Sequence, residues 1–227
     1  MPLPVPLRLI VLDCDGTLID SQHNIVANMT AAFASMGLPP PDGEAIRSLI
    51  GLSLEATLRR LLPDGDEGDV VRFVTAYRHQ FTMQHETGAA PDPLYPQVTE
   101  ILQELDGAGY LLGVATRKSR RGLDAVLKGH NLLDIFVTRQ TTDGHPGKPH
   151  PAMLLQAMAE AGVGPEDTMM VGDTSFDMAM AVNAGVYPVG VAWGYHAVTD
   201  LTAAGAAVVL QGFGDLPALV RERWPAP

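Results

Sequence analysis

Residues 7–20 read LRLIVLDCDGTLID, and this stretch decides the fold. It begins with a short, mostly apolar run of branched side chains, which is typical of a strand buried on both faces. The run ends abruptly in Asp13 and Asp15, which extended backbone directs to one side while Cys14 points to the other. Gly16 then permits a sharp turn. The stretch therefore predicts a buried strand with two acids at its carboxyl end and a Cys14 that packs in the core.

Similar apolar runs recur along the chain and alternate with helical patterns. The further predicted strands are residues 110–115, 135–138, 168–171 and 187–191, and the predicted helices are residues 98–105, 119–129, 151–161 and 176–184. Strands that alternate with helices of this length indicate parallel βαβ units. We predict an α/β fold with a three-layer, Rossmann-like parallel sheet in the strand order 3-2-1-4-5, the first strand lying at its centre.

The segment of residues 22–88 interrupts this alternation. It contains three helical patterns, at residues 24–36, 53–62 and 69–85, separated by loops rich in proline and glycine, and no convincing strand. We interpret it as an all-helical insertion directly after the first strand. The predicted domains are an α/β catalytic core of residues 1–21 and 89–227 and a helical cap of residues 22–88.

The composition excludes several classes of protein. A net charge of −11 argues against non-specific binding to nucleic acid or to an anionic membrane, because both require a basic face. The single cysteine, Cys14, excludes an intramolecular disulfide and a multi-cysteine metal cluster. No convincing targeting segment and no apolar run near the roughly 18 residues of a membrane span are present. We therefore expect a cytoplasmic protein with no nucleic-acid or membrane partner.

Polar residues follow the predicted strands at the points where the strands end. In open α/β sheets, ligands bind beyond the carboxyl ends of the strands, so these residues are expected to converge at one edge. Asp173 and Asp177 are four residues apart and would share a face of a helix that starts there. The expected set is four carboxylates, one hydroxyl and one ammonium group: Asp13, Asp15, Thr116, Lys148, Asp173 and Asp177.

This set of groups suits phosphoryl transfer. A phosphate dianion repels an anionic nucleophile, so an aspartate can attack phosphorus only where a metal and cationic donors neutralise the oxygens. An all-oxygen ligand set favours Mg²⁺. The basic run Arg117–Arg121 lies near a predicted helix start, where the main-chain N–H groups of Arg117 and Lys118 are better phosphate donors than their side chains. A solvated turn is an equally good reading of the four basic side chains.

At these positions the sequence resembles the haloacid dehalogenase superfamily, specifically its phosphoglycolate phosphatase-like phosphatases. The segment 13–20 (DCDGTLID) is similar to the nucleophile motif of that superfamily. Thr116, Lys148 and the Gly172-Asp173 pair with Asp177 are similar to its second, third and fourth motifs. The order and spacing agree over nearly the whole chain, and the helical insertion lies where the family has its cap.

The resemblance implies a hydrolase of small phosphate monoesters, such as phosphoglycolate or another small phosphorylated metabolite, with Mg²⁺ as cofactor. By resemblance, Asp13 is the nucleophile and a metal ligand, and Asp15 is the general acid/base and binds the metal through its carbonyl group. The remaining implied roles are phosphate binding by Thr116 and Lys148, direct metal binding by Asp173 and support of the metal by Asp177. The helix-start argument adds the main-chain N–H of Arg117 to the predicted phosphate site.

Three other functions are open at this point. A sugar-phosphate mutase uses the same acids but returns the phosphoryl group to a bound intermediate. Dehalogenase activity is disfavoured, because that branch of the superfamily does without Mg²⁺ and this chain retains Asp15, Asp173 and Asp177. A non-catalytic binding protein on the same fold would be expected to lack a catalytic position, and none is missing.

Overall fold

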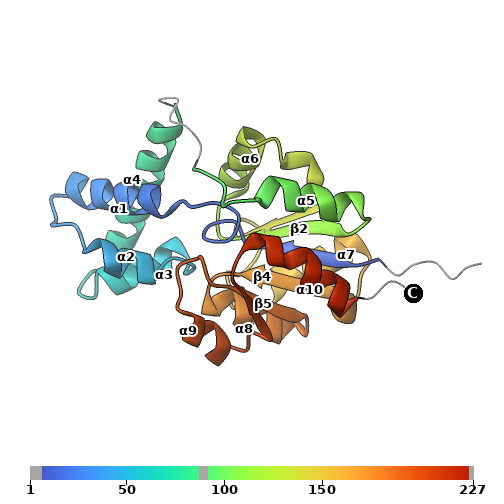
Figure 1. Ribbon diagram of the computed structural model, residues 1–227. Coiled ribbons are helices and arrows are strands. Elements are labelled where there is room, and N and C mark those ends of the chain that lie inside the picture. The colour runs from blue at the N-terminus through green and yellow to red at the C-terminus, as the bar shows by residue number, and fades with distance from the viewer. Residues whose placement is uncertain (1–6, 87–91, 225–227) are drawn as a thin grey trace, which may run out of the picture. The chain divides into compact units, whose positions relative to one another are not determined.

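The computed structural model describes residues 7–86 and 92–224, without the side chains of residues 84–86. The chain divides into two compact units, an α/β unit of Met1–Asp20 with Pro93–Pro227 and a helical unit of Ser21–Asp92. Figure 1 labels the helices of the second unit α1 to α4. The predicted domain boundary between residues 88 and 89 lies outside the described residues. Among the helices described, none is both long enough and apolar enough to cross a membrane.

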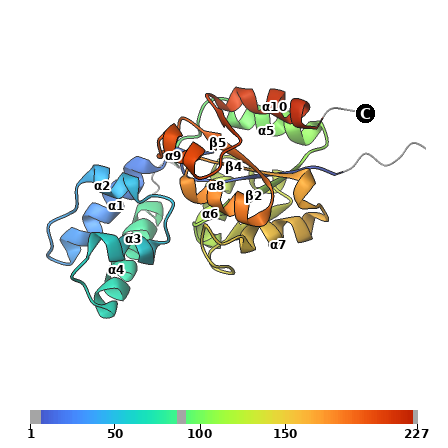
Figure 2. The same cartoon turned by 90° about the horizontal axis from the view of Figure 1, so that it is seen from below.

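Figure 2 shows the layers of the α/β unit, with α5 and α10 on one side of the sheet and α7 on the other. Strand β1 is buried at every position, so its alternate residues serve two separate cores. Ile10 and Leu12 pack with α5, α6 and α10, whereas Leu9 and Val11 pack with α7 and α8. The helices of this unit are α5 (Val98–Gly107), α6 (Arg120–Gly129), α7 (Ala152–Ala161), α8 (Ser175–Ala184), α9 (Val198–Ala203) and α10 (Leu216–Arg223). Cys14 is fully buried in the first of these cores, which confirms its predicted packing role.

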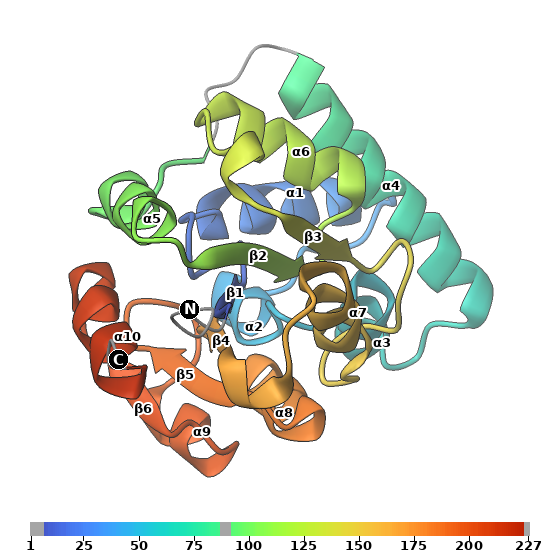
Figure 3. The same cartoon turned by 90° about the vertical axis from the view of Figure 1, so that its right-hand side faces the viewer.

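Within the described part of the chain, the sheet has six parallel strands in the order β3-β2-β1-β4-β5-β6, all labelled in Figure 3. The predicted α/β class and the order 3-2-1-4-5 are confirmed. The strands are β1 (Leu9–Leu12), β2 (Leu111–Thr116), β3 (Thr138–Thr141), β4 (Thr168–Gly172), β5 (Tyr187–Val191) and β6 (Val208–Leu210). The prediction omitted β6, because three residues at a sheet edge give too short an apolar run to recognise.

The third strand was predicted too early in the chain. Leu133–Ile135 forms a single 3₁₀ turn, and β3 follows it over four mainly polar residues. Thr138 and Gln140 are buried there because both donate hydrogen bonds to the Glu160 carboxylate, at 2.5 and 2.8 Å. An apolar pattern cannot identify a strand whose buried side chains are polar and are paired with a distant glutamate.

Over the residues that the structure describes, the helical unit contains four helices, one more than predicted. They are α1 (Gln22–Ser35), α2 (Gly43–Ser48), α3 (Leu54–Leu61) and α4 (Glu67–Glu86). Its own core includes Phe33 and Phe73, whose ring centroids are 4.6 Å apart. The helix that the prediction omitted, α2, is capped by Asp42, whose carboxylate accepts the N–H groups of Glu44 and Ala45. A six-residue helix has too few turns to show a periodic apolar face.

Candidate active site

The carboxyl edge of the sheet brings Asp13 and Lys148 together, although 135 positions of sequence separate them. Asp13 directly follows β1, and its main-chain N–H donates to the Val171 carbonyl at 2.9 Å, which continues the β1–β4 ladder. The ammonium of Lys148 lies 2.7 Å from Asp13 Oδ1 and 2.6 Å from Asp177 Oδ1. The side chains of Lys148 and Asp177 have no exposed surface. Lys148 is therefore a buried cation shared by two carboxylates.

Asp173 and Asp177 lie at the end of β4, but not on one helical face as the spacing predicts. Asp173 precedes the helix, Thr174 is the first capping residue, and α8 starts at Ser175. The Asp177 carboxylate turns back to accept hydrogen bonds from the Thr174 N–H at 3.0 Å and its hydroxyl at 2.6 Å. This capping box fixes one Asp177 oxygen and leaves the other for Lys148.

Asp173 is held by groups from two loops. The Thr17 hydroxyl donates to Asp173 Oδ1 at 3.1 Å, and the Tyr195 N–H donates to Oδ2 at 3.0 Å. Two glycines make room for this carboxylate. A Cβ on Gly16, which has φ +82°, would lie 2.2 Å from Asp173 Oδ2, and one on Gly194 would lie 2.1 Å from the Asp173 Cβ. The loop after β5 was not among the predicted parts of the site, although the glycine that follows the strand end was a visible signal.

We expect Gly194→Ala to lower the affinity of the site for a metal ion strongly. The new methyl group overlaps the Asp173 side chain, so either the carboxylate or the loop that supplies the Tyr195 N–H must move. Loss of such a support reduces metal affinity or activity by about 10- to 100-fold. Gly144→Ala is the matched control, because a Cβ there meets nothing within 4 Å. Equal metal titration curves for the two variants would show that the loop after β5 does not position Asp173.

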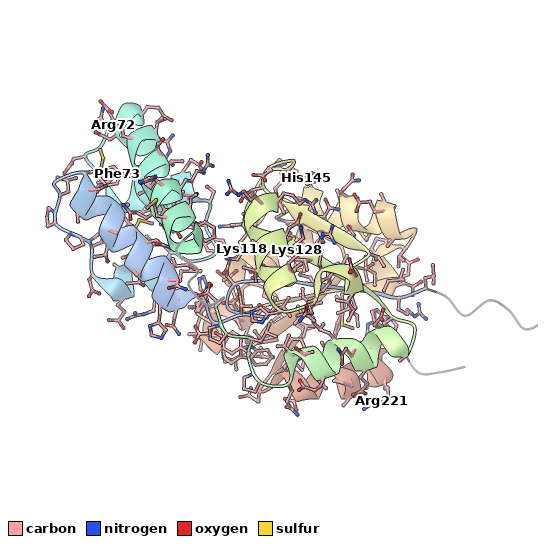
Figure 4. The ribbon with its side chains drawn as sticks, turned by 90° about the horizontal axis from the view of Figure 1, so that it is seen from above. Arg72, Phe73, Lys118, Lys128, His145 and Arg221 are labelled. Carbon is pink, nitrogen blue, oxygen red and sulfur yellow. The ribbon has the colours of Figure 1, made fainter. Side chains whose placement is uncertain are left out.

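The β2–α6 connection supplies a second group of polar side chains. The ammonium of Lys118, labelled in Figure 4, lies 2.8 Å from Asp15 Oδ1. Thr116 is buried at the end of β2, and its hydroxyl oxygen accepts the Lys118 N–H at 3.3 Å. The Arg117 guanidinium points to the Lys148 loop, where it donates to the Lys148 carbonyl. The Asp15 carboxylate therefore pairs with Lys118, whereas the Asp13 and Asp177 carboxylates pair with Lys148.

Burial shifts the protonation of the central groups. It raises the pKa of Asp13 to about 6, because desolvation and the Asp177 charge outweigh the attraction of Lys148. Burial likewise raises the pKa of Asp173 well above its usual range, with the charges of Asp177 and Asp13 acting in the same direction. Burial alone would lower the pKa of Lys148, but Asp13 and Asp177 more than offset it, so the pKa is raised and the ammonium form is favoured. The single positive charge of Lys148 therefore does not neutralise the buried carboxylates around it.

The residues present fit a divalent cation. One oxygen from each of Asp13, Asp173 and Asp177 lies within 4.8 Å of the others, and all three side chains are buried. Three buried carboxylates with a single ammonium carry excess negative charge, which a dication would compensate. Oxygen ligands are those that Mg²⁺ and similar hard cations prefer. A cation bound there would attract an anionic ligand toward the Asp13 carboxylate.

Comparisons with known proteins agree with this geometry. The family model described as haloacid dehalogenase-like hydrolase matches residues 10–191. A "Probable phosphatase IndB" from Dickeya dadantii is 37% identical over 215 residues, covering 92% of this chain and 91% of its own. A "Phosphoglycolate phosphatase" from Pseudomonas putida is 31% identical over 220 residues, covering 94% and 78%.

Solved structures have the same fold. A haloacid dehalogenase-like family hydrolase from Streptococcus pneumoniae superposes with a TM-score of 0.83 at 26% identity and covers 94% of this chain and 98% of its own. A haloacid dehalogenase-like hydrolase from Bacteroides fragilis gives a TM-score of 0.86 at 24% identity, covering 92% and 99%. The motifs around Asp13, Thr116, Lys148 and Asp173 lie within the matched range. The chain belongs to the haloacid dehalogenase-like hydrolase family.

Proposed function

We propose that this phosphatase hydrolyses small phosphate monoesters, with Mg²⁺ as cofactor and with a phosphoryl group carried transiently by Asp13. The observation that carries the proposal is the buried contact of Asp13 with Lys148, beside two further carboxylates at the carboxyl edge of the sheet. Relatives named phosphoglycolate phosphatase support phosphoglycolate, or a similarly small phosphorylated metabolite, as the substrate. The single cysteine is consistent with the cytoplasmic location that we propose with it.

In this proposal, Asp13, the Asp15 carbonyl group and Asp173 hold the Mg²⁺ ion, and Asp177 supports it from the adjacent capping box. Bound there, the ion supplies positive charge to the phosphate oxygens and so lowers their repulsion of a carboxylate nucleophile. The Thr17 hydroxyl and the Tyr195 N–H orient the Asp173 carboxylate. The raised pKa values of Asp13 and Asp173 support this assignment, because they reflect buried negative charge that a bound dication would compensate.

Phosphate binding is assigned to Thr116, Lys148 and the main-chain N–H of Arg117. The Thr116 oxygen already accepts the Lys118 N–H, so the hydroxyl proton is available to donate to a phosphate oxygen. The Lys148 ammonium is fixed between Asp13 and Asp177, and it offers charge without needing to reorganise. Together these groups would orient phosphorus toward Asp13.

The reaction then proceeds in two displacements at phosphorus. An Asp13 carboxylate oxygen forms a bond to phosphorus as the ester P–O bond breaks, and the Asp15 carboxyl gives its proton to the departing alkoxide oxygen. A water molecule next attacks phosphorus, Asp15 takes its proton, and the bond to Asp13 breaks to release inorganic phosphate. The Lys118 ammonium, 2.8 Å from Asp15 Oδ1, holds that carboxyl group in position.

The test is phosphate release from an aryl phosphate with Mg²⁺ and, in parallel, with a chelator. We expect activity that depends on the metal, and phosphate release from phosphoglycolate within a panel of sugar phosphates, nucleotides and pyrophosphate. Pyrophosphate is included because a relative named pyrophosphatase PpaX is 31% identical over 188 residues. Full activity in chelator would contradict the metal assignment. Conversion of a hexose phosphate to its isomer without phosphate release would identify a mutase instead.

We expect the metal-free protein to lose stability as the pH rises. Burial raises the Asp13 pKa from 3.8 to about 6, so the folded state binds this proton more tightly than the unfolded chain. The resulting stabilisation is complete below pH 3.8 and is lost as the pH passes 6, a change on the order of 3 kcal/mol. Thermal unfolding in chelator should show this fall in wild type and a smaller one in Asp13→Asn.

Added Mg²⁺ should raise the unfolding temperature more at high pH than at low pH, because only deprotonated carboxylates bind it. An unfolding temperature that is indifferent to Mg²⁺ across this pH range would argue against a metal site at these residues.

A further inference from the structure

The Arg117 side chain makes contacts that metal binding and phosphate binding do not require. Its Nη2 donates to the Lys148 carbonyl, and its guanidinium carbon lies 5.1 Å from the centre of the Phe176 ring. The Arg117 carbonyl in turn accepts the Thr142 hydroxyl at 3.1 Å. A Cβ on Gly147 would lie 3.9 Å from Arg117 Nε, so the guanidinium also lies close to the residue before Lys148.

These contacts join three chain segments that are far apart in the sequence. Arg117 follows β2, Lys148 is carried by the loop between β3 and α7, and Phe176 lies in the first turn of α8. The same three segments supply Thr116, Lys148 and Asp177. Figure 4 labels two residues from these segments: Lys118, which follows Arg117 in the sequence, and His145, which lies on the loop that carries Lys148.

The guanidinium is enclosed rather than presented to a ligand. Among the described residues, its Nε and Nη1 have no hydrogen-bond partner and almost no contact with solvent. Burial lowers the Arg117 pKa to about 10, with Asp177 and Asp13 opposing the shift, so the group stays charged at neutral pH. A substrate oxygen cannot reach Nε or Nη1 unless the surrounding loops move. Its contacts with the Phe176 ring and the Lys148 carbonyl therefore indicate that the side chain stabilises other parts of the protein and does not bind a ligand.

We propose that Arg117 is a positioning residue: its side chain clamps the Lys148 loop to the β2 end and to α8, and so sets the Lys148 ammonium between Asp13 and Asp177. Arginine suits this task because a planar guanidinium can donate to a carbonyl at its edge while stacking on an aromatic ring, which an ammonium group cannot do. The consequence for catalysis rests on the proposed phosphatase function, whereas the clamp itself does not.

A double-mutant cycle tests the catalytic consequence. Arg117→Met should lower kcat for an aryl phosphate by about 10- to 100-fold, since small displacements of a catalytic group have effects of that size. KM should change much less, because the side chain does not touch substrate. In a Lys148→Met background, Arg117→Met should cost less than about twofold, because the group that it positions is already gone. An equal loss in both backgrounds would overturn the proposal and indicate direct action on the substrate.

Chemical rescue and a matched control variant separate the effect of the guanidinium geometry from that of the positive charge. Guanidinium ion should restore part of the activity of Arg117→Ala, whereas Arg117→Lys should remain impaired because it keeps only the charge. Arg121→Met removes an exposed arginine four residues away and should leave kcat unchanged. Wild-type activity in Arg117→Lys would overturn the clamp and leave only an electrostatic role.

Amide hydrogen exchange tests the clamp without any substrate. Residues 144–150 should exchange at least about tenfold faster in Arg117→Met than in wild type, and at the wild-type rate in Arg121→Met. Unchanged exchange in Arg117→Met would overturn the proposal. If wild type proves to have no phosphatase activity, the proposed function fails while this measurement still decides whether Arg117 clamps the loop.

Discussion

Asp13→Asn is expected to reduce kcat by about 10⁴-fold or more, the size of loss seen when a nucleophile is removed from a preorganised site. The amide cannot supply the anionic oxygen that bonds to phosphorus. It keeps the shape of the side chain and a carbonyl oxygen, which can still accept the Cys14 N–H that now donates to Asp13 Oδ1 at 2.7 Å. The fold should therefore survive, and steady-state phosphate release is the measurement.

The control for Asp13→Asn is an equivalent change at an exposed acid, Asp64→Asn, which should leave kcat unaltered. Unfolding curves of the two variants in Mg²⁺ separate lost chemistry from lost structure. If Asp13→Asn retained more than about a tenth of wild-type kcat, nucleophilic attack by this residue would be ruled out.

Lys148→Met is expected to cost about 10³-fold in kcat, because it removes a fixed positive charge at the site of phosphoryl transfer. It also leaves Asp13 and Asp177 buried without their shared cation. Breaking such a pair from one side destabilises a protein by about 3–5 kcal/mol. In chelator the variant should therefore unfold at a lower temperature, and Mg²⁺ should recover part of the difference.

The pH profile of Lys148→Met gives a separate readout. Lys148 lowers the pKa of Asp13, so its removal should raise that pKa and move the acidic limb of kcat/KM to higher pH. Lys128→Met, an exposed change in the last turn of α6, is the matched control and should shift neither quantity. An acidic limb that stayed in place would show that the two charges are not coupled in the active protein.

The ends of the central strands could be predicted from the sequence, because each of these buried strands is an apolar run that stops at a polar residue. Leu9–Leu12 and Thr168–Gly172 have such runs, so the hydrophobic pattern alone assigned Asp13 and Asp173 to one edge of the sheet. Lys148 was predicted from its place in the loop after the third predicted strand and from motif order, since a lone lysine carries no periodic signal. The site residues could be predicted together because the carboxyl ends of parallel strands meet at one edge of the sheet.

Other features depend on tertiary contacts that no local pattern encodes. The polar side chains of β3 are buried because Thr138 and Gln140 pair with the distant Glu160. The Tyr195 N–H reaches Asp173 across 22 positions of sequence. A solvated turn was one of two equally good interpretations of the basic run, yet the Arg117 guanidinium is enclosed between a carbonyl group and the Phe176 ring. Each case requires the position of a distant residue.

Chemical trapping of the phosphorylated residue tests the central claim most directly. Borohydride reduces an acyl phosphate to an alcohol, so treatment during turnover should convert Asp13 to homoserine, which mass spectrometry of the peptide containing residues 9–20 detects. We predict homoserine at position 13 in wild type with substrate and Mg²⁺, and none without substrate or in Asp13→Asn. Trapping at any other residue, or sustained turnover with position 13 unmodified, would contradict the account.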